Sequence, residues 1–105
     1  KSTFLLEKAL DNYKQNNFME SKELFYELYH YYDKKDEYLF YLSLCQIKCT
    51  EFENALDNLY QCIENGVECY NVFYNFALCL ENIGDIEESS IFYDKANNLK
   101  IKYYL

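Results

Sequence analysis

The 105-residue chain contains no arginine, tryptophan or proline, only two glycines and a single histidine. Without proline and with so little glycine, it lacks the residues from which an all-β fold builds its many turns. No apolar run approaches the roughly 18–20 residues that a membrane-spanning helix requires, so we expect no membrane segment. Half of the residues are hydrophobic, which argues against intrinsic disorder and indicates a folded domain with a modest core.

Positive charge is scarce as well. Ten lysines stand against 18 acidic residues, which gives a net charge of −8. Basic side chains that neutralise phosphates dominate the affinity of proteins for nucleic acids, and an acidic surface repels a polyanion. We therefore expect no nucleic-acid partner.

Groups of residues that carry chemistry are also missing. Cys45 and Cys49 lie one helical turn apart, but His30 stands alone elsewhere and nothing completes a four-ligand metal site. There is no glycine-rich phosphate loop and no nucleophile–base pair. The sequence thus predicts no metal, no cofactor and no enzyme activity.

The five cysteines are an odd number, which excludes a complete disulfide framework and favours a reducing, cytoplasmic compartment. We interpret three of them as small buried core residues, namely Cys45, Cys62 and Cys79. Cys49 and Cys69 fall near helix ends, where exposure would make them reactive. His30 is interpreted as a surface residue. The tyrosines around it either cover the surface or form a second contact site, and they are Tyr29, Tyr31 and Tyr32.

A 34-residue period runs through the sequence. Small residues recur at this interval at Ser21, Ala55 and Ser89, and at Ala9, Ser43 and Ala77. Bulky residues recur at Phe18, Phe52 and Ile86, at Leu5, Leu39 and Phe73, and at Phe25, Leu59 and Tyr93. Such a period indicates stacked repeats. We predict a single domain over residues 1–105 with repeats at about 2–35, 36–69 and 70–103. Since the chain begins without Met or a signal-peptide layout, we expect it to belong to a longer protein.

Each repeat is predicted to form two helices, because its apolar residues follow helical rather than alternating spacing. The predicted helices lie near 3–15, 18–32, 37–48, 51–64, 70–83 and 86–101. Capping pairs are expected at Asn17 with Glu20, at Thr50 with Glu53, and at Asp85 with Glu88. Gly66 is expected in the left-handed conformation after a helix. The small residues should mark close helix crossings, so the fold class is all-α with stacked helical hairpins.

The residues that recur every 34 positions resemble the pattern of the tetratricopeptide repeat (TPR) family. Its eighth position is small and matches Ala9, Ser43 and Ala77; its twentieth is small and matches Ser21, Ala55 and Ser89. Its aromatic seventeenth position matches Phe18, Phe52 and Ile86. The usual tryptophan is replaced by Leu5, Leu39 and Phe73, and the closing proline is absent. The resemblance implies three TPR helix-turn-helix repeats stacked as a right-handed superhelix.

The resemblance also implies a non-enzymatic adaptor, scaffold or chaperone-like module. Such a module would bind a hydrophobic peptide or amphipathic helix of a partner protein in its concave groove. The groove-facing positions of the family that are apolar here are Leu6, Leu10, Tyr13, Phe40, Leu44, Ile47, Tyr74 and Leu78. The groove-edge positions are Lys14, Lys48, Asn71 and Asn75. Asn71 and Asn75 stand where chaperone-tail receptors carry cations, so we expect no acidic-tail ligand.

Two alternatives remain open at this point. In the first, the apolar groove residues are packed between helices or covered by a further segment. In the second, the chain self-associates as a structural segment of a larger repeat protein. A homodimer could then form through the groove or through the C-terminal face, where we single out Ile91, Tyr103 and Leu105. RNA recognition by helical repeats of similar length is disfavoured by the acidic charge.

Overall fold

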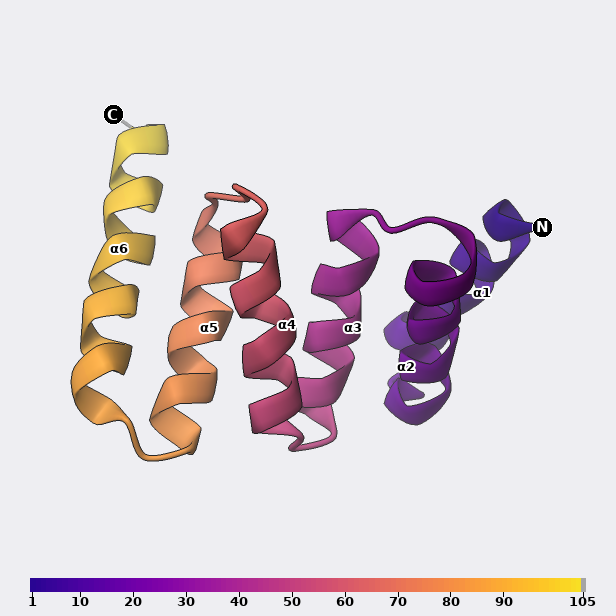
Figure 1. The fold of residues 1–105 in the computed structure, drawn as a ribbon, viewed down its shortest axis with the longest axis horizontal. Helices are drawn as coiled ribbons and strands as arrows, with labels where there is room; N and C mark the ends of the chain where they lie inside the picture. The colour runs from indigo at the N-terminus through magenta and orange to yellow at the C-terminus, as the bar shows by residue number, and fades with distance from the viewer. Residues whose placement is uncertain (105) are drawn as a thin grey trace.

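The chain folds into consecutive helices joined by short turns (Figure 1). The computed structural model describes the backbone of residues 1–104 and the side chains of residues 1–99. The helices are α1 (Ser2–Lys14), α2 (Phe18–Glu27), η1 (Leu28–Tyr32), α3 (Asp36–Lys48), α4 (Phe52–Glu64), α5 (Tyr70–Asn82) and α6 (Ile86–Tyr104). No strand occurs between residues 1 and 104. The predicted all-α fold with six α-helices is therefore confirmed.

One predicted helix differs from the structure. The segment 18–32 was expected to be one α-helix, but α2 ends at Glu27 and continues as the π-helical turn η1. A π-turn holds one more residue than an α-turn, and the amide of Asp33 donates to the carbonyl of Leu28 at 2.9 Å. This geometry keeps Leu28 buried and leaves Tyr31 and Tyr32 exposed.

The three turns within the hairpins share one backbone geometry at 34-residue intervals. Asn16, Thr50 and Gly84 each have a positive φ, of 64°, 60° and 96°. In each turn the next residue's amide donates to a carbonyl five residues earlier: Asn17 to Asn12 and Glu51 to Gln46, both at 2.8 Å, and Asp85 to Leu80 at 2.9 Å. The 34-residue period is therefore present in the backbone as well as in the sequence.

This turn geometry corrects the expected capping. Thr50 cannot serve as an N-cap because the turn needs it in the left-handed conformation, so Glu51 is the N-cap of α4. Asn17 does precede α2, but its side chain makes no capping hydrogen bond. In the third pair the amide of Glu88 donates to Oδ1 of Asp85 at 3.3 Å, so Asp85 is an N-cap as predicted. The amide of Asp85 donates to the carbonyl of Leu80 instead of to Glu88, so the reciprocal half of the capping box does not form. Gly66 has a φ of +88°, as expected.

Small residues allow the two helices of a hairpin to approach closely. The hydroxyl of Ser21 donates to the carbonyl of Ala9 at 2.8 Å, and that of Ser89 donates to the carbonyl of Ala77 at 3.0 Å. All members of the two small-residue columns are buried: Ala9, Ser43, Ala77, Ser21, Ala55 and Ser89. The expected role of these columns at helix crossings is confirmed.

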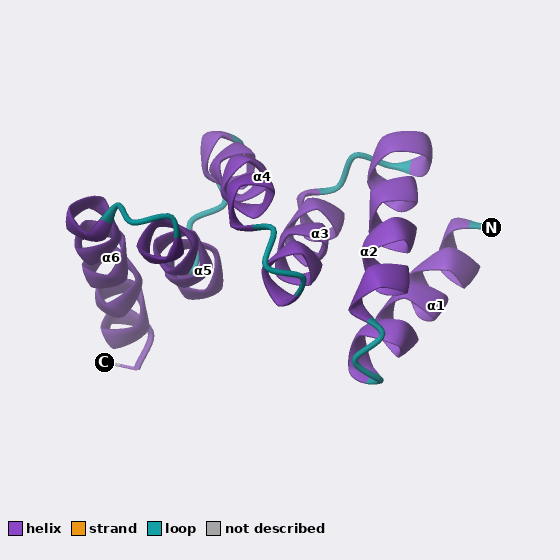
Figure 2. Ribbon diagram, turned by 90° about the horizontal axis from the view of Figure 1, so that it is seen from below, coloured by secondary structure: helices purple, strands orange, loops and turns teal. Residues whose placement is uncertain are grey.

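The helices pack chiefly against their neighbours along the chain, and the molecule measures 40 × 31 × 25 Å. Figure 2 shows α4 on one side of the row formed by α3 and α5. None of the helices in the described part of the chain is long and apolar enough to cross a membrane.

Candidate functional site

The predicted groove positions lie on α1, α3 and α5, and we call them the apolar stripe: Leu6, Leu10, Tyr13, Phe40, Leu44, Ile47, Tyr74 and Leu78. None of these side chains is fully buried. Seven are half-buried and Tyr74 is 39% exposed. Five of them, Leu6, Leu10, Tyr13, Phe40 and Ile47, also pack against the core. The stripe is thus a partly exposed edge of the core that solvent or a ligand can reach.

Aromatic contacts hold both ends of the stripe in place. Tyr13 lies edge-on to Phe18 and Tyr41, at centroid distances of 5.3 and 6.0 Å. Burial raises the pKa of the Tyr13 hydroxyl. At the other end, Tyr74 stacks on Tyr70 at 5.6 Å and meets the edge of Tyr93 at 5.3 Å. These rings are therefore oriented before any ligand arrives.

A hydrogen bond fixes Tyr93 behind Tyr74. The Tyr93 hydroxyl donates to Oε1 of Glu81 at 2.8 Å. Burial, and then this hydrogen bond, raise the pKa of Tyr93 well above its ordinary value of 10.0. The protonated phenol, which is the form that donates to Glu81, is therefore favoured.

The predicted edge residues are not equivalent. Lys14 and Lys48 are exposed, and the Lys48 ammonium lies 5.7 Å from the centre of the Phe18 ring. Asn71 is exposed, whereas Asn75 is half-buried and donates its side-chain amide to the carbonyl of Asn71 at 2.7 Å. Asn75 thus uses a donor within its own helix, while Lys14, Lys48 and Asn71 keep exposed side chains at this edge.

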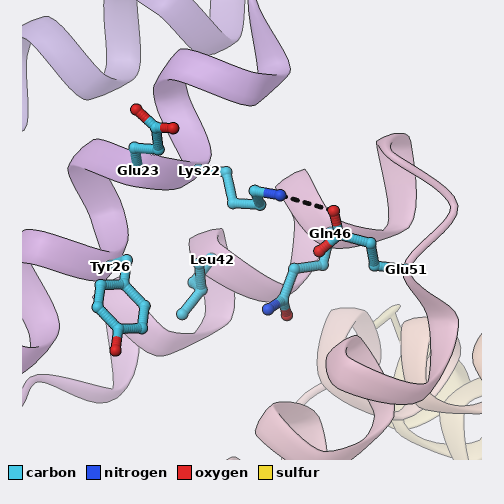
Figure 3. A pocket seen from close by; sticks show the side chains of 6 residues that line it. All are labelled: Lys22, Glu23, Tyr26, Leu42, Gln46 and Glu51. Atoms are coloured by element: carbon cyan, nitrogen blue, oxygen red, sulfur yellow. Dashed lines mark hydrogen bonds and ion pairs between the residues drawn. The ribbon is translucent and has the colours of Figure 1, made fainter.

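A cleft that the sequence did not reveal lies between α2 and α3. Its volume is about 310 Å³, and its lining residues are Lys22, Glu23, Tyr26, Leu42, Gln46 and Glu51 (Figure 3). Lys22 Nζ and Glu51 Oε2 form an ion pair of 2.6 Å. The hydrogen bond to Glu51 raises the pKa of Lys22. The one sign of this cleft in the sequence was Gln46, a polar residue at the repeat position that Leu80 occupies 34 residues later.

The tyrosines near η1 are mostly exposed. Tyr31 is 75% exposed, Tyr32 is exposed and Tyr29 is half-buried. His30 is exposed, as predicted, with ring centroids 4.2 Å from Tyr26 and 5.1 Å from Tyr29. The side chains of Tyr103 and Leu105, which belong to the suspected C-terminal face, lie outside the described residues, while Ile91 is exposed.

The prediction that three of the five cysteines are buried core residues is confirmed. Cys45, Cys62 and Cys79 are completely buried, Cys49 is half-buried and Cys69 is exposed; all five are free thiols. Burial raises the pKa of Cys62 and of Cys79 from 9.0 to about 12. Cys49 Sγ lies 3.6 Å from Met19 Sδ. Three of the cysteines are therefore core residues in which the thiol form is favoured.

These thiol pKa values predict a loss of stability in alkali. The unfolded chain releases the protons of Cys62 and Cys79 near pH 9.0 and the folded chain near pH 12. Between these values the unfolded state binds fewer protons, so the free energy of unfolding falls as the pH rises. Urea unfolding at about pH 8 and about pH 10.5 should show a smaller fall for the Cys62→Ala/Cys79→Ala variant than for the wild type. Cys69→Ala should match the wild type, and an equal fall in all three proteins would contradict the prediction.

The chemistry of the two surfaces differs. The stripe offers apolar and aromatic contacts, while the cleft offers two carboxylates, a phenol and an amide. Within the residues whose side chains are described, no cluster of three or more His, Cys, Asp or Glu residues could hold a metal ion. Comparison of the chain with models of protein families and with curated proteins finds no match in either case.

Proposed function

We propose that the chain is a non-enzymatic protein-interaction module of the tetratricopeptide type, and that its apolar stripe binds a hydrophobic peptide or an amphipathic helix of a partner protein. The observation that carries this proposal is the incomplete burial of all eight stripe residues on α1, α3 and α5. Exposed apolar surface of this kind marks interaction sites in soluble proteins. The 34-residue repeat of the turn geometry supports the assignment to the family.

The side chains suit a ligand with apolar anchors. Leu44 and Leu78 are half-buried and Tyr74 is exposed, so each has area left to lose to a ligand. Each anchor that fills such a surface contributes roughly 1.5–3 kcal/mol before the costs of association are subtracted. Two or three anchors then correspond to a dissociation constant on the order of micromolar. The odd number of cysteines, all of them free, supports a reducing, cytoplasmic location.

The test begins with a displayed library of helical peptides selected on the wild-type domain. The selected peptides should carry apolar residues three and four positions apart. Leu44→Glu and Tyr74→Glu should each raise the dissociation constant by about tenfold or more, because a carboxylate would be desolvated against the ligand. The matched control is Tyr31→Glu, which makes the same substitution at an exposed tyrosine near η1. Unchanged binding by the Leu44 and Tyr74 variants would contradict the proposal.

Self-association is the second candidate, favoured by the exposed isoleucines Ile86 and Ile91 on α6. Light scattering across a range of concentrations separates it from peptide binding. A concentration-dependent dimer that is lost on Ile91→Asp would support contact through the C-terminal face. A dimer lost on Phe40→Asp would support contact through the stripe, and a monomer at all concentrations would leave the stripe free for a ligand.

A further inference from the structure

The connection between α4 and α5 carries the only Asn-Gly pair of the sequence, Asn65-Gly66. The main-chain nitrogen that follows an asparagine can attack the carbon of the side-chain amide, and a side chain on the following residue hinders this attack. Gly66 has no side chain, and a Cβ atom added there would meet nothing within 4 Å. Asn65 and Gly66 are both exposed, so water reaches the two groups. The pair therefore has the least hindered sequence for this reaction and lies in open surroundings.

The folded structure holds both reacting groups in hydrogen bonds. Nδ2 of Asn65 donates to Oδ1 of Asp36 at 2.7 Å, and Oδ1 of Asn65 accepts from Nε2 of Gln61 at 2.9 Å. The amide of Gly66 donates to the carbonyl of Ile63 at 2.9 Å. The attacking nitrogen must lose its proton, and the side chain must turn toward it, so these hydrogen bonds have to break first. The native fold therefore protects Asn65.

The hydrogen bond between Asn65 and Asp36 also joins two helices. Asp36 is the first residue of α3, and Asn65 directly follows α4. The two helices pack against each other, and these two ends lie at the same end of their hairpin (Figure 1). Contacts at helix ends with solvent-exposed hydrogen bonds are among the first to open locally in a folded protein. Local opening of this hairpin end therefore removes the protection of Asn65.

We propose that Asn65 is a deamidation site whose reaction is controlled by the hydrogen bond to Asp36. When the hairpin end opens, the nitrogen of Gly66 forms a bond to Cγ of Asn65, and the bond from Cγ to Nδ2 breaks. The departing amino group takes up the proton of the main-chain amide and leaves as ammonia, and a cyclic succinimide remains. Water then opens this ring to give aspartate or isoaspartate.

The product cannot restore the native contact. A carboxylate at position 65 has no proton to donate to Asp36, and the two carboxylates repel each other at this short distance. Isoaspartate also adds a carbon atom to the main chain between α4 and α5. The reaction therefore converts a transient opening of the second hairpin into a permanent loss of contact between α3 and α4.

The rate of conversion of Asn65 tests the role of Asp36. The 105-residue chain is incubated in mildly alkaline buffer, and peptide mass spectrometry measures the converted fraction over time. Asp36→Ala should raise the rate about fivefold, because one net hydrogen bond that holds the native form is lost. Asp36→Asn keeps an oxygen acceptor and should stay close to the wild-type rate. Glu37→Ala, which removes the next carboxylate of α3, should do the same, and wild-type protein unfolded in urea should convert fastest.

The Asn65→Asp variant tests the consequence. Its melting temperature should lie several degrees below that of the wild type at neutral pH. In acid the carboxylates are protonated, so the repulsion with Asp36 should vanish and the difference should shrink. Asn98→Asp makes the same substitution at an exposed position of α6 and should have little effect. Equal rates for Asp36→Ala and the wild type, faster conversion of another asparagine, or equal melting temperatures for the two aspartate variants would overturn the proposal.

Discussion

Replacing Phe25 with alanine should lower the free energy of unfolding by about 3–5 kcal/mol, a cost typical of a buried phenylalanine. Phe25 is completely buried in α2, and its ring stacks on Tyr41 of α3 at 5.0 Å with an interplanar angle of 9°. The residue therefore joins the first hairpin to the second. A folded domain has a total stability of about 5–15 kcal/mol, so this single substitution should remove a large fraction of it.

Urea denaturation followed by circular dichroism measures this effect. Phe4→Ala is the matched control, because Phe4 is 67% exposed in α1; its effect should stay within about 0.5 kcal/mol. A loss below about 1 kcal/mol for Phe25→Ala would mean that the contact between α2 and α3 does not limit stability.

Replacing Ala77 with leucine should destabilise the third hairpin by about 1–3 kcal/mol through overpacking. Ala77 is completely buried, and its carbonyl accepts the hydroxyl of Ser89 at 3.0 Å. Three additional carbon atoms cannot fit between α5 and α6 without separating the helices, which also breaks this hydrogen bond. The buried Ser89 hydroxyl then loses its partner, and this loss adds to the cost.

Hydrogen exchange locates the effect of Ala77→Leu along the chain. Protection should fall most in α5 and α6 and least in α1 and α2, because each helix packs mainly against its chain neighbours. Ser90→Leu is the control, because Ser90 lies next to Ser89 in α6 but is exposed. This variant should keep its protection. Similar losses of protection for both variants would contradict the close-crossing explanation.

Helix positions were predictable because their determinants are periodic. The predicted ends of α1, α3, α4 and α5 fall within one residue of the observed ends, since apolar spacing marks the buried face of each helix. The π-helical turn after α2 was not predictable, because Leu28–Tyr32 has the same apolar character as an ordinary helix end. The left-handed Thr50 was missed for a related reason: a β-branched residue seldom adopts this conformation, and only the fixed turn geometry requires it.

The candidate sites were also predictable only in part. The positions of the stripe followed from helical spacing, but the degree of exposure of Tyr74 depends on how α5 and α6 pack and required the structure. The cleft was not predictable, because its lining comes from α2, α3 and the turn before α4. Lys22 and Glu51 are far apart in the sequence, so the sequence did not indicate their 2.6 Å ion pair.

The packing of each helix against its neighbours along the chain has a kinetic consequence. Most native contacts join residues that are close in sequence, so folding closes short loops and loses little chain entropy before each contact forms. Such low contact order corresponds to folding in microseconds to milliseconds. A hairpin can nucleate anywhere and recruit the next one, and within residues 1–104 the middle hairpin, which packs against both of the others, should open less often than either of them.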